Sequence, residues 1–150
     1  MKYEINLASG EKNINLGELV RFLQGFRASY ILALEFLSNQ NHLKIYDFEY
    51  LKNKEYLVDN FRDFMYLSEF NRYSILELSE YDIPKEYDIE FEKITQNSPL
   101  KFIGKCSGIS LLALSLAVSI SGGEADLKNM KFNVKPLSEA IISIKKAFDN

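Results

Sequence analysis

The sequence predicts an α+β fold: a single domain over residues 1–150, with a mixed or antiparallel sheet packed by about four helices. Three observations support this. A length of 150 residues is typical of one domain. Hydrophobic residues make up 47% and charged residues 26%, as in globular proteins. Strand-like alternation and helix-like periodicity both occur, without the strict βαβ rhythm of a doubly wound sheet.

The N-terminal region predicts one strand and one long helix. Alternating apolar residues form the strand: Tyr3, Ile5 and Leu7. An apolar stripe at helical spacing follows, and Asn15 with Glu18 three residues later is typical of a helix start. Gly25 lies inside this helix, where the missing side chain allows a neighbouring element to pack closely.

The central region is less regular. Residues 42–53 fit either a strand or a helix, and the sequence leaves that choice open. Apolar residues at helical spacing predict a helix over residues 54–70. Tyr73, Ile75 and Leu76 then suggest another short strand.

The C-terminal region alternates strands and helices. Ile89 and Phe91 alternate with acidic residues and predict a half-exposed strand, and residues 100–103 predict the strand that pairs with it. An uncharged apolar run follows. Phe132 and Val134 indicate a short strand, and a last helix begins near Pro136, which suits a first helical turn.

Charge and composition restrict the partners and the compartment. The formal net charge of −3 and the pI near 5.3 disfavour nucleic-acid binding, which relies on basic surfaces. Cys106 is the single cysteine, so no intrachain disulfide forms, and the N-terminus lacks the apolar run of a secretory signal. These features predict a cytoplasmic protein. The abundance of Lys, Asn, Ile and Tyr suggests a bacterial or phage origin.

The sequence carries no defensible catalytic signature, and we predict no catalytic residue, metal or cofactor. Gly-rich phosphate loops are missing. His42 and Cys106 are the only His and Cys, too few for a zinc site and weak support for a nucleophile–base pair. Asp59 and Asp63, four apart on a predicted helix, leave open a carboxylate site for a small ligand, a cation or an enzymatic reaction.

An acidic stretch is the first feature that indicates a partner. Asp88, Glu90 and Glu92 alternate, so on one strand they would project from one face. Such a face predicts docking of a basic protein partner. The competing interpretation is an edge strand that its charges protect from aggregation.

The uncharged run 106–123 is the second feature. It is short and serine-rich for a membrane span. Small residues four apart, such as Ala113 and Ala117, permit close helix–helix approach, and with Ser119 they predict a self-association surface. A central buried helix and a membrane-active element are the alternatives.

Taken together, these features predict a small protein that acts by binding other proteins, as an inhibitor, an accessory factor or an oligomeric adaptor. Two alternatives stay open. The apolar run 106–123 would serve a small membrane-active effector, and the carboxylates of the central helix would serve a ligand binder or an enzyme.

Overall fold

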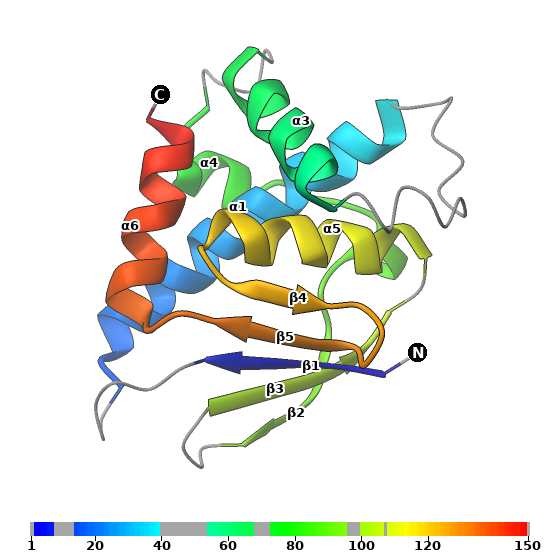
Figure 1. The fold of residues 1–150 in the computed structure, drawn as a ribbon. Coiled ribbons are helices and arrows are strands. Elements are labelled where there is room, and N and C mark those ends of the chain that lie inside the picture. Colours follow the sequence, from blue (N-terminus) through cyan, green and yellow to red (C-terminus); the bar gives the residue numbers. More distant parts are fainter. Residues whose placement is uncertain are drawn as a thin grey trace.

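A computed structural model shows one sheet with helices packed on one of its faces (Figure 1). This arrangement confirms the predicted α+β class, with a mixed sheet. The structure describes residues 2–7, 14–39, 54–67, 73–95, 100–106 and 108–149.

The strands of the described residues form one five-stranded sheet with the order β2-β3-β1-β5-β4. The strands are β1 (Lys2–Leu7), β2 (Phe91–Thr95), β3 (Leu100–Lys105), β4 (Glu124–Asp126) and β5 (Lys131–Val134). β1 lies at the centre, where it pairs antiparallel with β3 and parallel with β5. The two hairpins, β2–β3 and β4–β5, are antiparallel, so β2 and β4 lie at the two ends of the strand order.

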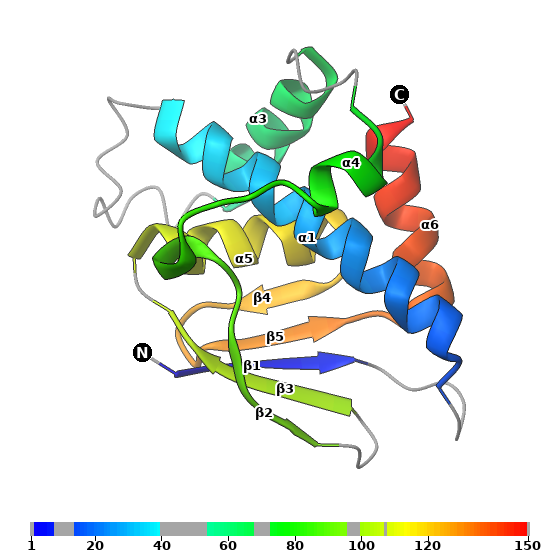
Figure 2. The same ribbon diagram turned by 180° about the vertical axis from the view of Figure 1, so that it is seen from behind.

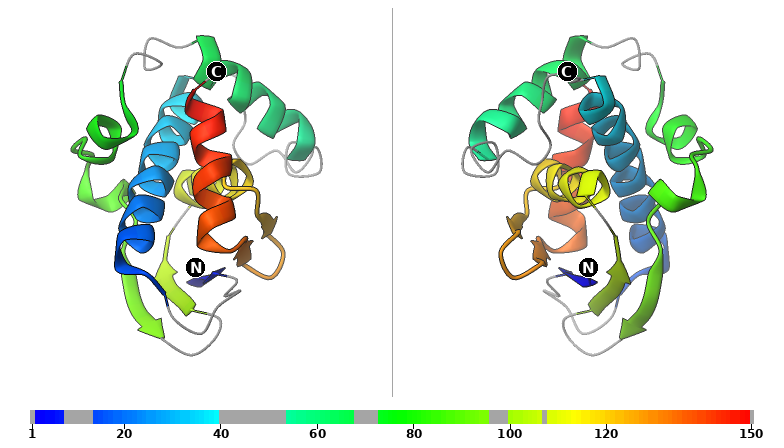
Figure 3. Two further views of the ribbon diagram at one scale, coloured as in Figure 1. Left: turned by 90° about the vertical axis from the view of Figure 1, so that its left-hand side faces the viewer. Right: turned by 90° about the vertical axis from the view of Figure 1, so that its right-hand side faces the viewer.

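The helices form a layer over this sheet (Figure 2). They are α1 (Leu16–Asn39), α3 (Lys54–Leu67), α4 (Ile75–Ser79), the 3-10 helix η2 (Lys85–Tyr87), α5 (Gly108–Ile120) and α6 (Leu137–Phe148). α5 contacts β4 and β5 on one side and α1 on the other, and α1 also contacts α4 and α6. The side views show the strands on one side of this helical layer (Figure 3). α5 is therefore the central helix of the molecule.

The alternation of β1 decides which face of the sheet is buried. Tyr3, Ile5 and Leu7 are each 2% exposed and face the helices. The residues between them point to the other face, where Glu4 lies 3.9 Å from the Lys101 amine of the neighbouring strand. One sheet face thus forms the core, and the other carries charged pairs, as is common in antiparallel sheets.

Local sequence signals explain where several elements begin. The backbone N–H of Glu18 donates to the Asn15 side chain at 3.1 Å, which confirms the predicted start of α1. α6 begins directly after Pro136, also as predicted. Gly25 allows close packing as expected, because a Cβ added there would lie 2.9 Å from Cγ2 of Ile144 on α6.

Two local predictions were wrong or incomplete. The segment that includes Tyr73, Ile75 and Leu76 is not a strand: its residues from Ile75 on form α4. The Ser74 side chain accepts a hydrogen bond from the backbone N–H of Glu77, and the Glu77 carboxylate accepts one from the backbone N–H of Ser74. This complete capping box favours a helix more strongly than the apolar residues favour a strand. β4 was not predicted at all. Residues 42–53, for which strand or helix was left open, lie outside the described residues.

Candidate functional site

The three predicted docking carboxylates do not share one strand face. β2 begins at Phe91, so Asp88 and Glu90 precede the strand, and only Glu92 belongs to it. Glu90 and Glu92 are exposed, and Glu92 lies 3.3 Å from the Lys105 amine. The residues alternate in sequence, but the chain joins the sheet only at Phe91, after it has passed along the helical layer.

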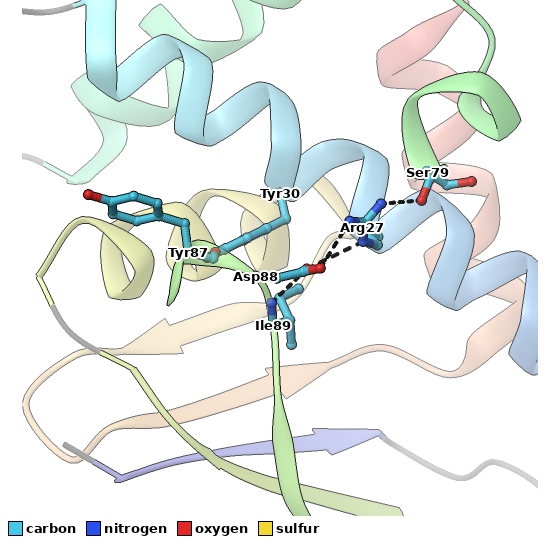
Figure 4. A network of polar contacts seen from close by, with 6 residues as sticks. All are labelled: Arg27, Tyr30, Ser79, Tyr87, Asp88 and Ile89. Atoms are coloured by element: carbon cyan, nitrogen blue, oxygen red, sulfur yellow. Dashed lines mark hydrogen bonds and ion pairs between the residues drawn. The ribbon is translucent and has the colours of Figure 1, made fainter. Parts of the chain in front are cut away.

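Asp88 is held by a structural contact instead. Its carboxylate accepts hydrogen bonds from Nε and Nη2 of Arg27, at 3.3 and 3.0 Å (Figure 4). The same guanidinium donates to the backbone carbonyl of Ser79, and the backbone N–H of Ile89 donates to Asp88 at 2.8 Å. Arg27 therefore ties the connection between α4 and β2 to α1. Asp88 contributes to this tie and not to an open acidic face.

Two tyrosines fasten the same connection. The Tyr30 hydroxyl donates to the carbonyl of Tyr87 (Figure 4), and the Tyr3 hydroxyl donates to the carbonyl of Glu90 at 3.0 Å. Burial raises the pKa of Tyr30 to about 12 and raises the pKa of Tyr3 far above its ordinary range. Both phenols stay neutral donors at physiological pH, so this cluster is structural.

Two of the three residues predicted for self-association lie inside the protein. Ala113 and Ala117 on α5 are both 0% exposed within a single copy of the chain. Ser119 is half-buried and donates to the carbonyl of Ser115 at 3.0 Å. α5 packs against α1, β4 and β5 and most of its residues are buried, which confirms a central buried helix. In a single copy of the chain, Ala113 and Ala117 are therefore not on the surface.

The remaining sequence candidates gain little support. α5 has 13 residues, and none of the described helices is long and apolar enough to cross a membrane. Burial raises the pKa of the Cys106 thiol and disfavours a reactive thiolate, while His42 lies outside the described residues. Within the described part of the chain, no three His, Cys, Asp or Glu side chains gather as a metal site.

The structure reveals an acidic groove that the sequence alone did not indicate. It lies between α3 and the strand β4 and has a volume of about 610 Å³. α3 presents one face to it through residues at helical spacing, while the end of α5 and the start of β4 form the other wall. The described lining residues are Glu55, Val58, Asp59, Arg62, Ser119, Gly123, Glu124 and Ala125.

Negative charge dominates this acidic groove. Glu55 and Asp59 come from α3 and Glu124 comes from β4, and all three are exposed. Arg62 is the one cation among the described lining residues. Among the ion pairs between described residues, none involves Asp59 or Glu124. The groove therefore presents carboxylates to solvent, where a cationic group can meet them.

Two of the predicted residues belong to this acidic groove. Asp59, proposed for a carboxylate site, lines it, while Asp63 is exposed on α3 and is not among its described lining residues. Ser119, proposed for self-association, also lines it. Glu55 and Glu124 were missed, because their common location depends on the packing of α3 beside β4. The i, i+4 spacing of Glu55 and Asp59 was the only local signal.

Neither protein-family models, curated proteins nor solved structures give a match to this chain. The acidic groove therefore has to be interpreted from its own geometry and charge.

Proposed function

We propose that the protein acts by binding another protein, and that the acidic groove between α3 and β4 receives a lysine- or arginine-rich segment of that partner. The observation that carries the proposal is three solvent-exposed carboxylates, Glu55, Asp59 and Glu124, that line one groove of about 610 Å³. An inhibitor or an accessory factor would use such a surface. The proposal keeps the basic partner that the sequence predicts. It places the binding site for that partner in the acidic groove and not in the region of Asp88.

Charge complementarity supports a basic occupant. Carboxylates gathered in a groove create a local negative potential that attracts cations and speeds association. Val58 and Ala125 add apolar surface that a side-chain stem of lysine or arginine can cover.

Affinity capture with paired charge variants tests this proposal. The baits are the wild-type chain, Asp59→Lys/Glu124→Lys in the groove, and Glu86→Lys/Glu90→Lys as control. The control changes the net charge equally, at exposed carboxylates that are not among the described lining residues of the groove. The partner recovered from the native host is purified and titrated against each chain. We expect the groove variant to bind at least about tenfold more weakly, because like charges are then juxtaposed.

The control bait should retain wild-type affinity, and raising the salt concentration should weaken the wild-type complex. Equal loss of binding in both variants would show an effect of net charge and not of the groove. Full binding by the groove variant, or the absence of any stoichiometric protein partner, would refute the proposal. Recovery of a homo-oligomer in place of another protein would also refute the proposal, unless the groove variant abolished that homo-oligomer.

A further inference from the structure

A second concavity lies on the other side of the helical layer, where α1, α4 and α6 meet. Its volume is about 190 Å³. The described lining residues are Arg21, Gln24, Gly25, Ile75, Leu76, Ile141, Ile144 and Lys145. This three-helix pocket shares no described lining residue with the acidic groove.

α1 and α6 pack closely beside the pocket, where Gly25 of α1 is buried. Ile144 approaches it closely, and a Cβ on Gly25 would lie only 2.9 Å from Cγ2 of Ile144. Four isoleucine and leucine side chains from α4 and α6 line the pocket. Its interior is therefore apolar and favours a hydrocarbon group.

The charged residues of the three-helix pocket are all cationic. Arg21 on α1 and Lys145 on α6 line it, and no carboxylate is among the described lining residues. Both cations are exposed, and neither takes part in an ion pair between described residues. A chain with net charge −3 thus places two cations, unpaired among the described residues, beside an apolar pocket. An occupant with an anionic group would form charge-assisted hydrogen bonds with them.

We propose that the three-helix pocket binds a small amphipathic carboxylate, an aliphatic or aromatic acid with about six carbons in its apolar part. The size follows from the volume, since an apolar cavity of about 150 Å³ holds benzene. The hydrocarbon part packs against Ile141 and Ile144, and the carboxylate lies beside Arg21 and Lys145. This site is independent of the proposed protein-binding function.

Titration of the isotope-labelled full chain with hexanoate, followed by NMR, tests this assignment. Hexanol and hexylammonium serve as probes of the same length with neutral and positive heads. We expect saturable shifts at the amides of Gly25, Leu76 and Lys145 with hexanoate. Hexylammonium should bind at least about tenfold more weakly, because a cation meets two like charges.

Variants separate the contributions of charge and shape. The double variant Arg21→Gln/Lys145→Gln should bind hexanoate roughly tenfold more weakly, or weaker still. It should bind hexanol as the wild type does, and this unchanged binding would also show that the variant is folded. Leu76→Asp adds a carboxylate at a residue that is already 52% exposed, and should abolish hexanoate binding. Ile142→Asp, equally exposed on α6 but not among the described lining residues, is the matched control and should bind normally.

Three results would overturn the proposal. They are no saturable hexanoate binding at millimolar concentrations, equal binding of hexanoate and hexylammonium, and unchanged hexanoate affinity in the double glutamine variant.

Discussion

At the scale of single residues, buried hydroxyl groups determine how the connection between α4 and β2 is attached. Tyr30 is 1% exposed and Tyr3 is 2% exposed, and each donates to a backbone carbonyl of that connection. A buried carbonyl without a donor costs about 1–3 kcal/mol. Gly104 makes room for one of these contacts, because a Cβ there would lie 2.5 Å from the Tyr3 hydroxyl. Gly104 and Tyr3, which are far apart in sequence, thus together hold the chain at Glu90 in place.

The raised pKa of Tyr30 makes the stability of the folded protein depend on pH in the alkaline range. It is raised from 10.0 to about 12, so the folded state favours the neutral phenol. This contribution is fully present below pH 10 and is lost as the pH rises towards 12, because the unfolded chain ionises first. Tyr30→Phe lacks the ionisation. The difference in unfolding free energy between wild type and this variant should therefore fall by roughly 1 kcal/mol between pH 10 and 11.

Urea denaturation of both chains at several pH values from 8.5 to 11 measures this difference. At the lowest pH, Tyr30→Phe should be less stable by about 1 kcal/mol, the usual contribution of one hydrogen bond. Tyr56→Phe is the control, because this tyrosine is 55% exposed, and it should follow the wild-type curve. Parallel curves for wild type and Tyr30→Phe would contradict the prediction.

At the scale of elements, periodicity predicted the long elements and failed on the short ones. The stripe of α1 and the alternation of β1 were recognisable, since their patterns repeat over enough residues to identify a period. α4 has five residues, too few to show one, and its apolar residues suggested a strand. The available signal was the capping pair Ser74 and Glu77. β4 has three residues and depends on pairing with β5.

The acidic stretch shows why a correct pattern can give a wrong surface. Asp88, Glu90 and Glu92 alternate as a strand would, yet β2 begins only at Phe91. The partner that holds Asp88 is Arg27, 61 residues earlier in the chain. No local pattern contains that contact. Short-range alternation predicts which side chains share a face only where the strand itself forms.

The contact between α1 and α6 leads to a prediction about Gly25. Alanine favours a helix interior over glycine by about 1 kcal/mol, but a Cβ at this position would lie 2.9 Å from Ile144 Cγ2. Ile144 is 2% exposed and branched at Cβ, so it cannot turn away easily. Overpacking costs roughly 1–3 kcal/mol. The overpacking cost exceeds or cancels the gain, so Gly25→Ala should lower the unfolding free energy by up to about 2 kcal/mol.

A double-mutant cycle with Ile144→Ala isolates this contact. In the Ile144→Ala background the obstructing methyl group is gone, so Gly25→Ala should become neutral or stabilising. Urea denaturation of the four chains gives the interaction energy. If Gly25→Ala changed stability equally in both backgrounds, the close approach of Ile144 would not be the reason for glycine at this position.

At the scale of the whole molecule, the candidate site depends on packing between distant segments. The acidic groove combines α3 with the end of α5 and with β4, so its carboxylates come from positions as far apart as Glu55 and Glu124. The sequence predicted an acidic docking surface and a helix that includes Asp59. It could not place them together, because the position of α3 beside β4 follows from tertiary contacts. Because tertiary contacts also decide what covers α5, its small residues were compatible in sequence with both a buried helix and an oligomer contact.

The central position of α5 leads to a prediction that separates these two roles. Ala117 is 0% exposed, so Ala117→Leu forces extra carbons into a filled core and should cost roughly 1–3 kcal/mol of unfolding free energy. Sedimentation equilibrium should give the same oligomeric state for the variant and the wild type. Ser138→Leu, at an exposed residue of α6, is the matched control and should change stability by no more than about 0.5 kcal/mol. An Ala117→Leu chain with unchanged stability and an altered oligomeric state would instead place α5 at a subunit interface. The core would then have to rearrange to expose that helix, and the burial of α5 would describe only one state of the protein.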